Sequence, residues 1–294
     1  MAITTTSVMA DTVPTVLENA RFTEQFIAEM SALVWNIRKQ LHDGKNVNLP
    51  YFGIVTAAGL TEGIDMITSQ TMADTLVTIT PAEVGCKIIL TDKLVRDDKE
   101  DIKAAAGRIL GNAMEVKRDK DLITLFQTAA TTLGAGTTAT MGQFAAARAI
   151  LKGNAVSSGG PAPGGLVAVI HPYVTLDIVD VLTPLMPGSA ATTQAFSSPI
   201  ADEVIRNYGV GKLFGVPIIE DGNIVAAAGT CRGGMFATGE GGAIVLATAN
   251  EWSVEPERDA SLRATELNVV GEYGVGYYLN NWCVELNHDA TVPD

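Results

Sequence analysis

Two stretches decide the fold of this chain: NVNLPY at residues 46–51 and LVTITPAEVG at residues 76–85. In both, apolar residues alternate with polar ones, which is the period-two pattern of a strand with one apolar face. Between the two limbs lie eighteen mostly polar, glycine-containing residues, from 57 to 74. The pattern predicts one long two-stranded ribbon with a broad tip.

Such a ribbon needs support, because an isolated two-stranded hairpin is only marginally stable in water. This one contains too few apolar residues to form a core of its own. We therefore expect it to rest on another surface, either the body of its own chain or a neighbouring subunit.

A very long helix is predicted after the ribbon. A short strand at 86–90 is followed by the acidic run DDKED at 97–101, which suits a helix N-terminus because the helix dipole favours negative charge there. The helix is expected from about 98 to 131, roughly 50 Å long at 1.5 Å per residue. Gly107 and Gly111 are costly inside a helix, so they indicate a site of close backbone packing. The predicted buried stripe is Ile102, Ala106, Ile109, Ala113, Val116, Ile123 and Phe126.

The rest of the chain divides into an arm, an inserted unit and late strands. Residues 1–16 are threonine-rich and predict an extended arm, and residues 17–40 have a helical pattern. After a linker at 132–140, strands and helices are mixed up to residue 250, with a long surface loop at 183–199.

Long alternating strands return from residue 251 onward. Both these strands and the long helix need a packing partner. We therefore expect the C-terminal sheet to pack along the helix at 98–131, with the unit at 140–250 inserted between them.

Composition limits the class of protein. The 294-residue chain is 47% hydrophobic and has a formal net charge of −13, so it can form a sizeable core but lacks the clustered cations of a nucleic-acid reader. It shows no signal peptide and no membrane segment, so we expect a soluble protein made inside a cell. Cys86, Cys231 and Cys283 have neither disulfide nor metal spacing and are expected to be buried thiols.

The sequence contains no pattern typical of an enzyme, a cofactor site or a metal site. The three histidines, His42, His171 and His288, are widely separated, and no serine stands in a G-x-S-x-G turn. GVGK at 209–212 is not a phosphate-binding loop, because Arg206 and Leu213 occupy positions that require glycine and Ser or Thr.

Two charged groups each allow two interpretations. The basic residues Lys117, Arg118 and Lys120 have acidic neighbours, which predicts ion pairs along the helix, with weak contact with DNA as the alternative. A second group predicts either a structural turn with ion pairs or a contact between subunits. It consists of Glu255, Glu257, Arg258, Asp259 and Arg263.

The order of these segments resembles the HK97 fold of tailed-bacteriophage major capsid proteins, over essentially the whole chain. The two ribbon stretches resemble the family's E-loop, LTD at 90–92 and the helix to Phe126 resemble its spine helix, and GKLFGVPI at 211–218 is similar to a segment of its axial domain. The resemblance implies an α+β fold with an N-terminal arm, E-loop β-ribbon, long spine helix, peripheral domain and inserted axial domain. The implied boundaries are 1–45 for the N-terminal arm and helix, 46–83 for the E-loop, 84–131 and 251–294 for the peripheral domain, and 132–250 for the axial domain.

The resemblance also implies a function and partners. It implies a structural protein, not an enzyme, that assembles in the host cytoplasm as hexamers and pentamers into the icosahedral capsid of a virion. The shell would enclose double-stranded DNA with weak non-specific contact, and would use a portal, a separate scaffolding protein and, optionally, decoration proteins. The ribbon would contact an adjacent subunit through Tyr51, Phe52, Ile54, Glu62, Asp65, Val77 and Ile79.

In one branch of the family, an E-loop lysine forms an isopeptide bond with an asparagine of a neighbour, helped by a glutamate. Residues 46–84 contain no lysine, so we expect a shell without such cross-links. Two other interpretations stay open: an encapsulin-like bacterial compartment, which shares the fold but encloses enzymes, and a soluble α/β enzyme with an unrecognised site.

Overall fold

The structure is a computed structural model and describes residues 30–39, 44–53, 55–63, 65, 69–72, 74–97, 102–155, 157, 159–182, 211–227 and 229–290. Its helices are α1 (Met30–Leu33), α2 (Asp92–Asp97), α3 (Ile102–Thr124), α4 (Met141–Gly153) and α5 (Pro172–Leu182). Its strands are β1 (Trp35–Arg38), β2 (Val47–Phe52), β3 (Asp74–Ile79), β4 (Ala82–Thr91), β5 (Thr131–Thr137), β6 (Leu166–Ile170), β7 (Lys212–Leu213), β8 (Val216–Glu220), β9 (Cys231–Ala237), β10 (Ile244–Asp259), β11 (Ala264–Tyr277) and β12 (Cys283–His288).

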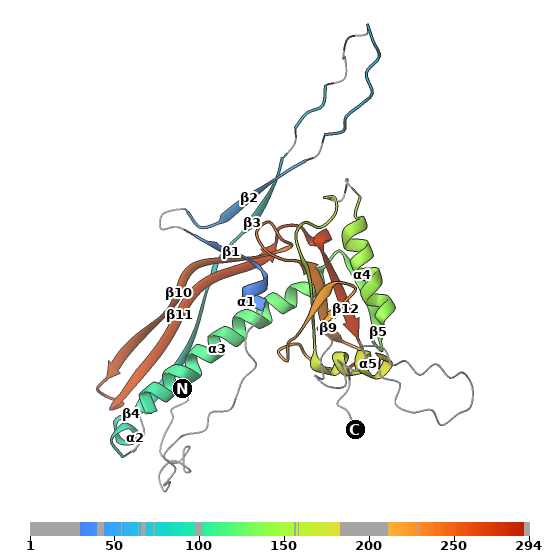
Figure 1. The fold of residues 1–294 in the computed structure, drawn as a ribbon. Coiled ribbons are helices and arrows are strands. Elements are labelled where there is room, and N and C mark those ends of the chain that lie inside the picture. Colours follow the sequence, from blue (N-terminus) through green and yellow to red (C-terminus); the bar gives the residue numbers. More distant parts are fainter. Residues whose placement is uncertain are drawn as a thin grey trace, which may run out of the picture.

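The predicted ribbon is present. Strands β2 and β3 pair antiparallel, with Val47 opposite Ile79 and Phe52 opposite Asp74. From their outer ends the chain continues away from the body, as Figure 1 shows. After β3 the chain passes through Thr80 and Pro81 directly into β4, so one extended run connects the ribbon to the body.

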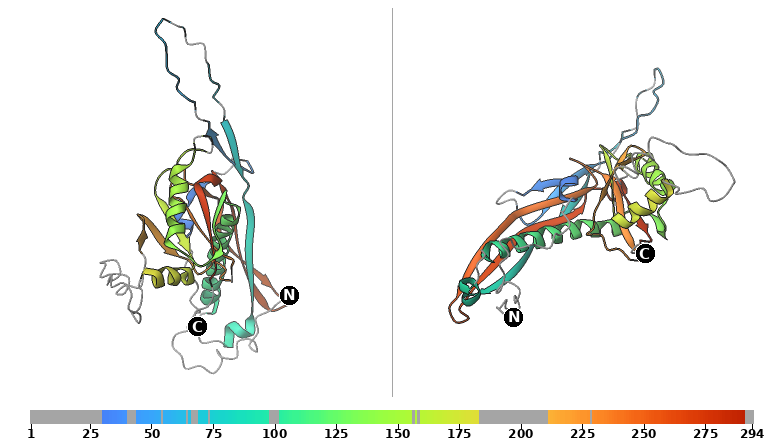
Figure 2. Two further views of the ribbon diagram at one scale, coloured as in Figure 1. Left: turned by 90° about the vertical axis from the view of Figure 1, so that its right-hand side faces the viewer. Right: turned by 60° about the horizontal axis from the view of Figure 1, so that its bottom comes forward.

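The first layer of the body is a four-stranded sheet covered by a helix. The strand order is β1-β10-β11-β4, and β10 and β11 form a long antiparallel hairpin. Helix α3 runs along one face of this sheet (Figure 2). Leu110 and Met114 of α3 form a buried cluster with Val269 of β11, so the sheet and helix stabilise each other by burying apolar surface.

The second layer is a six-stranded sheet in the order β5-β12-β9-β6-β8-β7, with α4 and α5 packed against it. It contains much of the largest buried cluster, including Phe126, Phe144 and Phe236. Gly234 of β9 is required there, because a Cβ at this position would lie 2.4 Å from the Phe126 ring. Together the two sheets and their helices make the α+β fold that the sequence predicts.

The long helix ends earlier than predicted. It stops at Thr124 and continues as a 3-10 turn at Leu125–Thr128 instead of reaching residue 131. The predicted stripe is partly wrong as well, since Ile109 is 47% exposed. From Ile102 to Met114 the packed face advances in steps of four, which leaves the predicted Ile109 and Ala113 on the solvent side. Its buried side chains are Ile102, Ala106, Leu110, Met114, Asp119, Leu122 and Ile123.

Three strands differ from the prediction. Residues 35–38, expected to be helical, form β1, and the expected linker at 132–140 is largely β5. The expected packing of the C-terminal sheet along the long helix is confirmed for β11. It is wrong for the final strand, β12, which pairs with β5 and β9 in the six-stranded sheet. Alternation identifies a strand and its buried face but not its neighbour, because both sheets here have an apolar side.

The chain also crosses the predicted boundary at residue 250 without a break, because β10 runs from Ile244 to Asp259. The predictions for the arm at 1–16, most of the helix at 17–40 and the loop at 183–199 lie outside the described residues. So do the start of the long helix at 98–101 and Ile54.

Candidate assembly surfaces

The root of the ribbon is attached to the body through Tyr278. Its ring makes edge contacts with Trp35 of β1, at 5.5 Å between ring centroids, and with Tyr51 of β2, at 6.1 Å. Its hydroxyl donates a hydrogen bond to the Pro50 carbonyl at 3.1 Å. The ribbon therefore leaves the body in a defined direction.

The inner face of the ribbon root belongs to the subunit's own core. Ile79 is 4% exposed and clusters with Val245 and Ala247 of β10. Val77 and Tyr51 are half-buried. The predicted contact between Ile79 and a neighbouring subunit is therefore wrong, because its side chain is already covered by its own chain.

The outer face of the ribbon is uncovered. Phe52 is 55% exposed and Leu76 is 57% exposed, and the apolar side chains of Val55, Leu60 and Met72 are also exposed. Five exposed large apolar side chains on one projection are unusual for a surface that stays in water. These five residues are called the outer ribbon surface below.

Beyond β2 and β3 the two limbs are joined by a side chain. The Gln70 amide accepts a hydrogen bond from the Thr56 backbone N–H at 2.8 Å and donates one to the Thr56 carbonyl at 2.5 Å. The Gln70 side chain thus makes the pair of hydrogen bonds that a backbone residue of a neighbouring strand would make. The predicted contact residues Glu62 and Asp65 are exposed in this distal part, and residues 46–83 contain no Lys, Arg or His.

The charged group at residues 255–263 covers the end of β10 and the turn that leads to β11, and two of its residues have bonds within their own chain. Arg258 donates two hydrogen bonds to the Asp92 carboxylate at the start of α2, at 2.5 and 2.7 Å, and so holds the pKa of Asp92 below its usual range. Asp259 accepts hydrogen bonds from the Ser261 hydroxyl and backbone N–H, which lowers its own pKa.

The other residues of this turn point to solvent. Glu255, Glu257 and Arg263 have exposed side chains, and Arg263 contributes its backbone carbonyl, which accepts from the Asp92 N–H at 2.9 Å. The structural-turn interpretation therefore accounts for Arg258 and Asp259. Contact with another subunit stays a prediction for Glu255, Glu257 and Arg263.

Gly107 and Gly111 do not serve the close packing that the sequence suggested. A Cβ at either position would meet nothing within 4 Å. Gly107 lies on the exposed face of α3, and Gly111 is half-buried. Within the described part of the subunit this prediction is wrong, because the neighbouring sheet contacts the other side of the helix.

Polar contacts between α3 and the sheet were not predicted. The Trp252 indole N–H donates to Glu115 at 2.7 Å, and the Tyr273 hydroxyl donates to Asp121 at 2.7 Å. Arg118 binds Glu115 and lies 5.2 Å from the Trp252 ring centroid. With Lys117 bonded to Asp121, the predicted ion pairs along the helix are confirmed for two of the three basic residues. The sequence signal for these contacts is the pair of aromatic residues Trp252 and Tyr273, because a buried or half-buried N–H or O–H group needs a polar partner.

Two histidines are buried. The Nδ1 of His171 accepts a hydrogen bond from the Tyr173 N–H at 3.1 Å at the start of α5, and His288 is stacked on Phe144 at 5.9 Å between ring centroids. Burial lowers the pKa of both side chains.

Among the described residues, no group of three or more His, Cys, Asp or Glu side chains is placed to hold a metal ion. No helix in that part of the chain is long and apolar enough to cross a membrane.

Similarity to known proteins is visible in the fold alone. No family model matches the sequence, and no curated protein matches it. A solved capsid of Helicobacter pylori bacteriophage KHP30, described as acidic stable, matches with a TM-score of 0.72 at 10% identity, covering 98% of both chains.

Two further solved structures are similar to this chain in fold. The capsid of a native GTA particle matches with a TM-score of 0.70 at 12% identity, covering 98% of this chain and 100% of the other. A Mycobacterium phage Che8 structure matches with a TM-score of 0.67 at 17% identity, covering 93% and 95%. The chain therefore has the HK97-type capsid fold over nearly its whole length.

Proposed function

We propose that this chain is the major capsid protein of a tailed bacteriophage, a structural subunit that builds an icosahedral shell around double-stranded DNA. The outer ribbon surface is the observation that carries the proposal. It exposes Phe52, Leu76 and three further apolar side chains on a projection that its own body supports only at the root. An adjacent subunit would cover this surface, which removes the apolar area from water.

In this proposal the subunits form hexamers and pentamers in the virion capsid after assembly in the host cytoplasm. The six-stranded sheet with α4 and α5 would be the axial domain, and the four-stranded sheet with α3 the peripheral domain. The predicted boundaries at 132–250 and 251–294 then need adjustment, because β5 and β12 share the axial sheet and β10 spans both parts. A separate scaffolding protein, a portal and optional decoration proteins complete the assembly.

Many modest contacts can hold such a shell together. Once a ring has begun to form, each added contact acts within one assembly and benefits from a high effective concentration. No enzymatic step is needed, so a structural role without catalysis fits the described surfaces.

The test removes apolar area from the ribbon without shortening it. Phe52→Ser combined with Leu76→Ser should leave a folded subunit, since both side chains are exposed, but should prevent normal shells. Val225→Ser is the matched control, because Val225 is 73% exposed and lies outside the ribbon. Sedimentation and electron microscopy give the outcome. Normal shells from the ribbon variant would contradict the proposed role of this surface.

A deletion gives a second check. Replacing residues 57–74 by a short turn should yield a soluble, folded subunit that forms no normal shell. Unfolding or aggregation of that variant would show that the tip belongs to the core of the subunit.

The alternative of an encapsulin-like compartment uses the same fold and the same ribbon contact. The contents of purified particles distinguish the two, since a phage head contains DNA and a compartment contains enzymes. Purely monomeric behaviour of the intact chain would instead revive the third interpretation, a soluble α/β enzyme.

A further inference from the structure

Tyr278 lies between the two sheets of the body and packs against two separate hydrophobic clusters. It directly follows β11 of the four-stranded sheet, and a short turn after it leads into β12 of the six-stranded sheet. Its ring packs against the largest buried cluster, which contains Phe126, and against the small cluster of Ile79, Val245 and Ala247 under the ribbon root. Among the described residues, no other partly buried hydrophobic side chain packs against both clusters. Tyr278 therefore connects the ribbon to both layers of the body.

Three aromatic side chains from different segments contact the Tyr278 ring. Trp35 of β1 and Tyr51 of β2 contact it edge-on. The third is Trp282, whose ring centroid lies 6.1 Å from that of Tyr278. Trp282 is itself fixed beside the six-stranded sheet, because it is 8% exposed and its indole N–H donates to the Gly160 carbonyl at 3.1 Å. One tyrosine ring thus contacts the ribbon, the four-stranded sheet and the turn before β12.

The return limb of the ribbon lies close to the same part of the chain. It passes over β11 at Gly274, where a Cβ atom would lie 2.9 Å from the Thr80 carbonyl oxygen and 3.1 Å from Pro81. Any side chain at Gly274 would therefore push this limb away from β11. The outgoing limb is held by the Tyr278 hydroxyl, which donates to the Pro50 carbonyl. Both limbs thus meet the body within residues 274–278.

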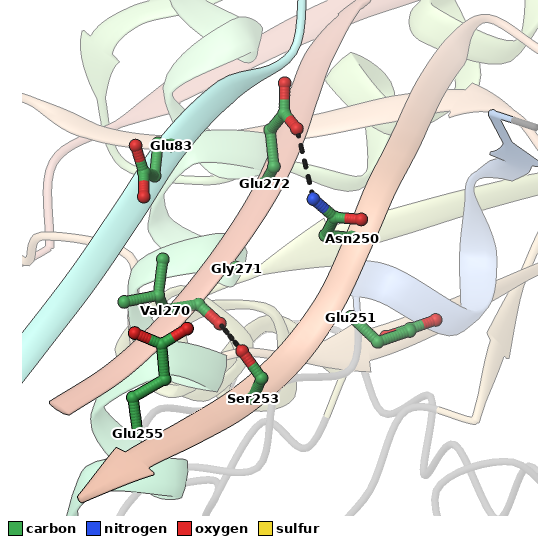
Figure 3. Close-up of a pocket in the computed structure, with 8 residues that line it drawn as sticks. All are labelled: Glu83, Asn250, Glu251, Ser253, Glu255, Val270, Gly271 and Glu272. Carbon is green, nitrogen blue, oxygen red and sulfur yellow. Dashed lines mark hydrogen bonds between the residues drawn. The ribbon is translucent and has the colours of Figure 1, made fainter. Parts of the chain in front are cut away.

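Beyond Gly274 the same face of β11 opens into a groove. Side chains alternate along a strand, so Glu272 and Val270 share the face of Gly274. They line a groove of about 520 Å³ between β4, β10 and β11, as Figure 3 shows. Its carboxylates are those of Glu83, Glu251, Glu255 and Glu272. Residues 46–83 contain no Lys, Arg or His, so the ribbon cannot form ion pairs with these glutamates, and its direction depends on the contacts at its root.

We propose that Tyr278 is the residue that positions the ribbon for assembly. It fixes the direction of the ribbon relative to both sheets and thereby the angle at which neighbouring subunits join. This inference rests on the proposed function, in which a neighbour covers the outer ribbon surface. That surface lies on the projecting part of the ribbon (Figure 1), so its place in space follows from the direction set at Tyr278.

Small errors in this direction become large at the far end of the ribbon. The limb from Tyr51 to Glu62 can reach about 35 Å at roughly 3.3 Å per residue. A tilt of about 10° at the root then moves the tip by about 6 Å, which exceeds the spacing of roughly 4.8 Å between paired strands. A closed assembly forms only if the same contact recurs at closely similar angles in its copies. A ribbon with a loose root would instead join neighbours at many angles and give shells of irregular size.

The first test compares Tyr278→Leu with Tyr278→Phe. Leucine keeps an apolar side chain but loses the ring contacts and the hydroxyl, whereas phenylalanine keeps the ring. Electron microscopy of the assembled particles gives the distribution of their diameters. Tyr278→Leu should lower the fraction of particles with the unaltered diameter several-fold, in favour of irregular shells and open sheets. Tyr278→Phe should restore most of that fraction.

The matched control is Tyr173→Leu, because Tyr173 of α5 is also half-buried and also makes an edge contact with an aromatic ring, that of His171. Thermal unfolding of the disassembled subunits shows whether the two leucine variants lose similar stability. Uniform particles from Tyr278→Leu would overturn the proposal. Equally irregular particles from Tyr173→Leu at a similar loss of stability would also overturn it, because the cause would then be a weakened subunit.

Gly274→Ala tests the root from the other limb, and it gives the answer if Tyr278→Leu does not fold. The added methyl group would lie 2.9 Å from the Thr80 carbonyl oxygen, so the return limb must shift while the Tyr278 ring is unchanged. Irregular particles are expected again, and Gly153→Ala is the control because its Cβ would meet nothing within 4 Å. Normal particles from a folded Gly274→Ala variant would contradict the proposal. If the unaltered chain forms no particles at all, the proposed function fails instead.

Discussion

The buried carboxylate of Asp119 on α3 accepts a hydrogen bond from the side-chain amide of Asn223 at 2.9 Å, across 104 residues of chain. The same carboxylate accepts a second bond from the Met30 backbone N–H at 3.2 Å. Asn223 is itself positioned by Asp221, whose carboxylate accepts from the Asn223 N–H at 2.8 Å. One carboxylate thus joins the long helix, the start of α1 and the turn after β8.

We predict that Asp119→Ala destabilises the subunit by roughly 2–4 kcal/mol. Asp119 and Met30 are 0% exposed, so the change leaves two buried donors without an acceptor, and each such loss costs about 1–3 kcal/mol. Urea unfolding of the disassembled subunit measures the free energy of unfolding. Asp119→Asn should lose less, because its amide oxygen still accepts one of the two bonds. An Ala variant as stable as the unaltered chain would show that this carboxylate does not hold the three segments together.

Replacing the helix glycines should stabilise the subunit. Gly107→Ala and Gly111→Ala remove backbone freedom from the unfolded chain, and each is expected to add up to about 1 kcal/mol because the new methyl group meets nothing within 4 Å. Thermal unfolding of the subunit is the measurement. A more stable subunit that no longer assembles would show that a neighbouring subunit packs on these glycines in the shell.

The ribbon could be predicted from sequence, whereas the partners of several segments could not. Alternation at 46–51 and 76–80, with too few apolar residues for a core, identifies a projecting hairpin directly. The same alternation at 282–286 identifies a strand but leaves its sheet open, and β12 lies between β5 and β9. The helix predicted at residues 35–38 is wrong because the strand pairing of these residues with β10, 210 residues later in sequence (Trp35 with Val245), is not visible locally.

For the candidate assembly surfaces too, some features could be predicted from the sequence and others could not. Exposure of Phe52 follows from its place on the polar side of the ribbon, and the ion pairs of Lys117 and Arg118 follow from helical spacing. The burial of Ile79 does not follow, because it depends on where the ribbon root meets β10. The energetic cost of Gly107 inside a helix indicates that some packing contact requires a glycine there. The sequence does not show whether that contact lies inside the subunit.

Acid should destabilise the subunit through two histidines. Burial lowers the pKa of His288 and His171 in the folded state, so the unfolded chain binds more protons between those lowered values and the ordinary pKa near 6.5. The stabilisation is complete above about pH 7 and is lost as the pH falls below about 6.5. Asp92 and Asp259 act in a separate window, because their lowered pKa values mean that their contribution is lost only below about pH 4.

His288→Phe tests this assignment. Phenylalanine keeps an aromatic ring against Phe144 and removes the titrating group. The free energy of unfolding should then depend less on pH between 5 and 7 than in the unaltered chain, and combining the change with His171→Asn should flatten it further. An unchanged slope in the double variant would assign the acid sensitivity of this window to other groups.

The mature shell is expected to contain no isopeptide cross-links. The reaction needs a lysine amine on the ribbon, and residues 46–84 contain none. Lys45 precedes the root of the ribbon, and Lys87 lies on β4, where its ammonium group is paired with Glu266. A strand rises about 3.3 Å per residue, so the tip near Glu62 lies tens of ångströms from either amine.

Under the proposed function, the stability of the shell then has to come from non-covalent contacts, such as the contact proposed for the outer ribbon surface. Mature particles boiled in detergent should run on a denaturing gel as one band near the 30.8 kDa of the monomer. The double variant Lys45→Arg, Lys87→Arg is the control, since arginine keeps the charge but does not form the bond, and its band should be the same. A ladder of higher bands that resists reducing agent would contradict the prediction, and loss of that ladder in the control would identify Lys45 or Lys87 as the nucleophile.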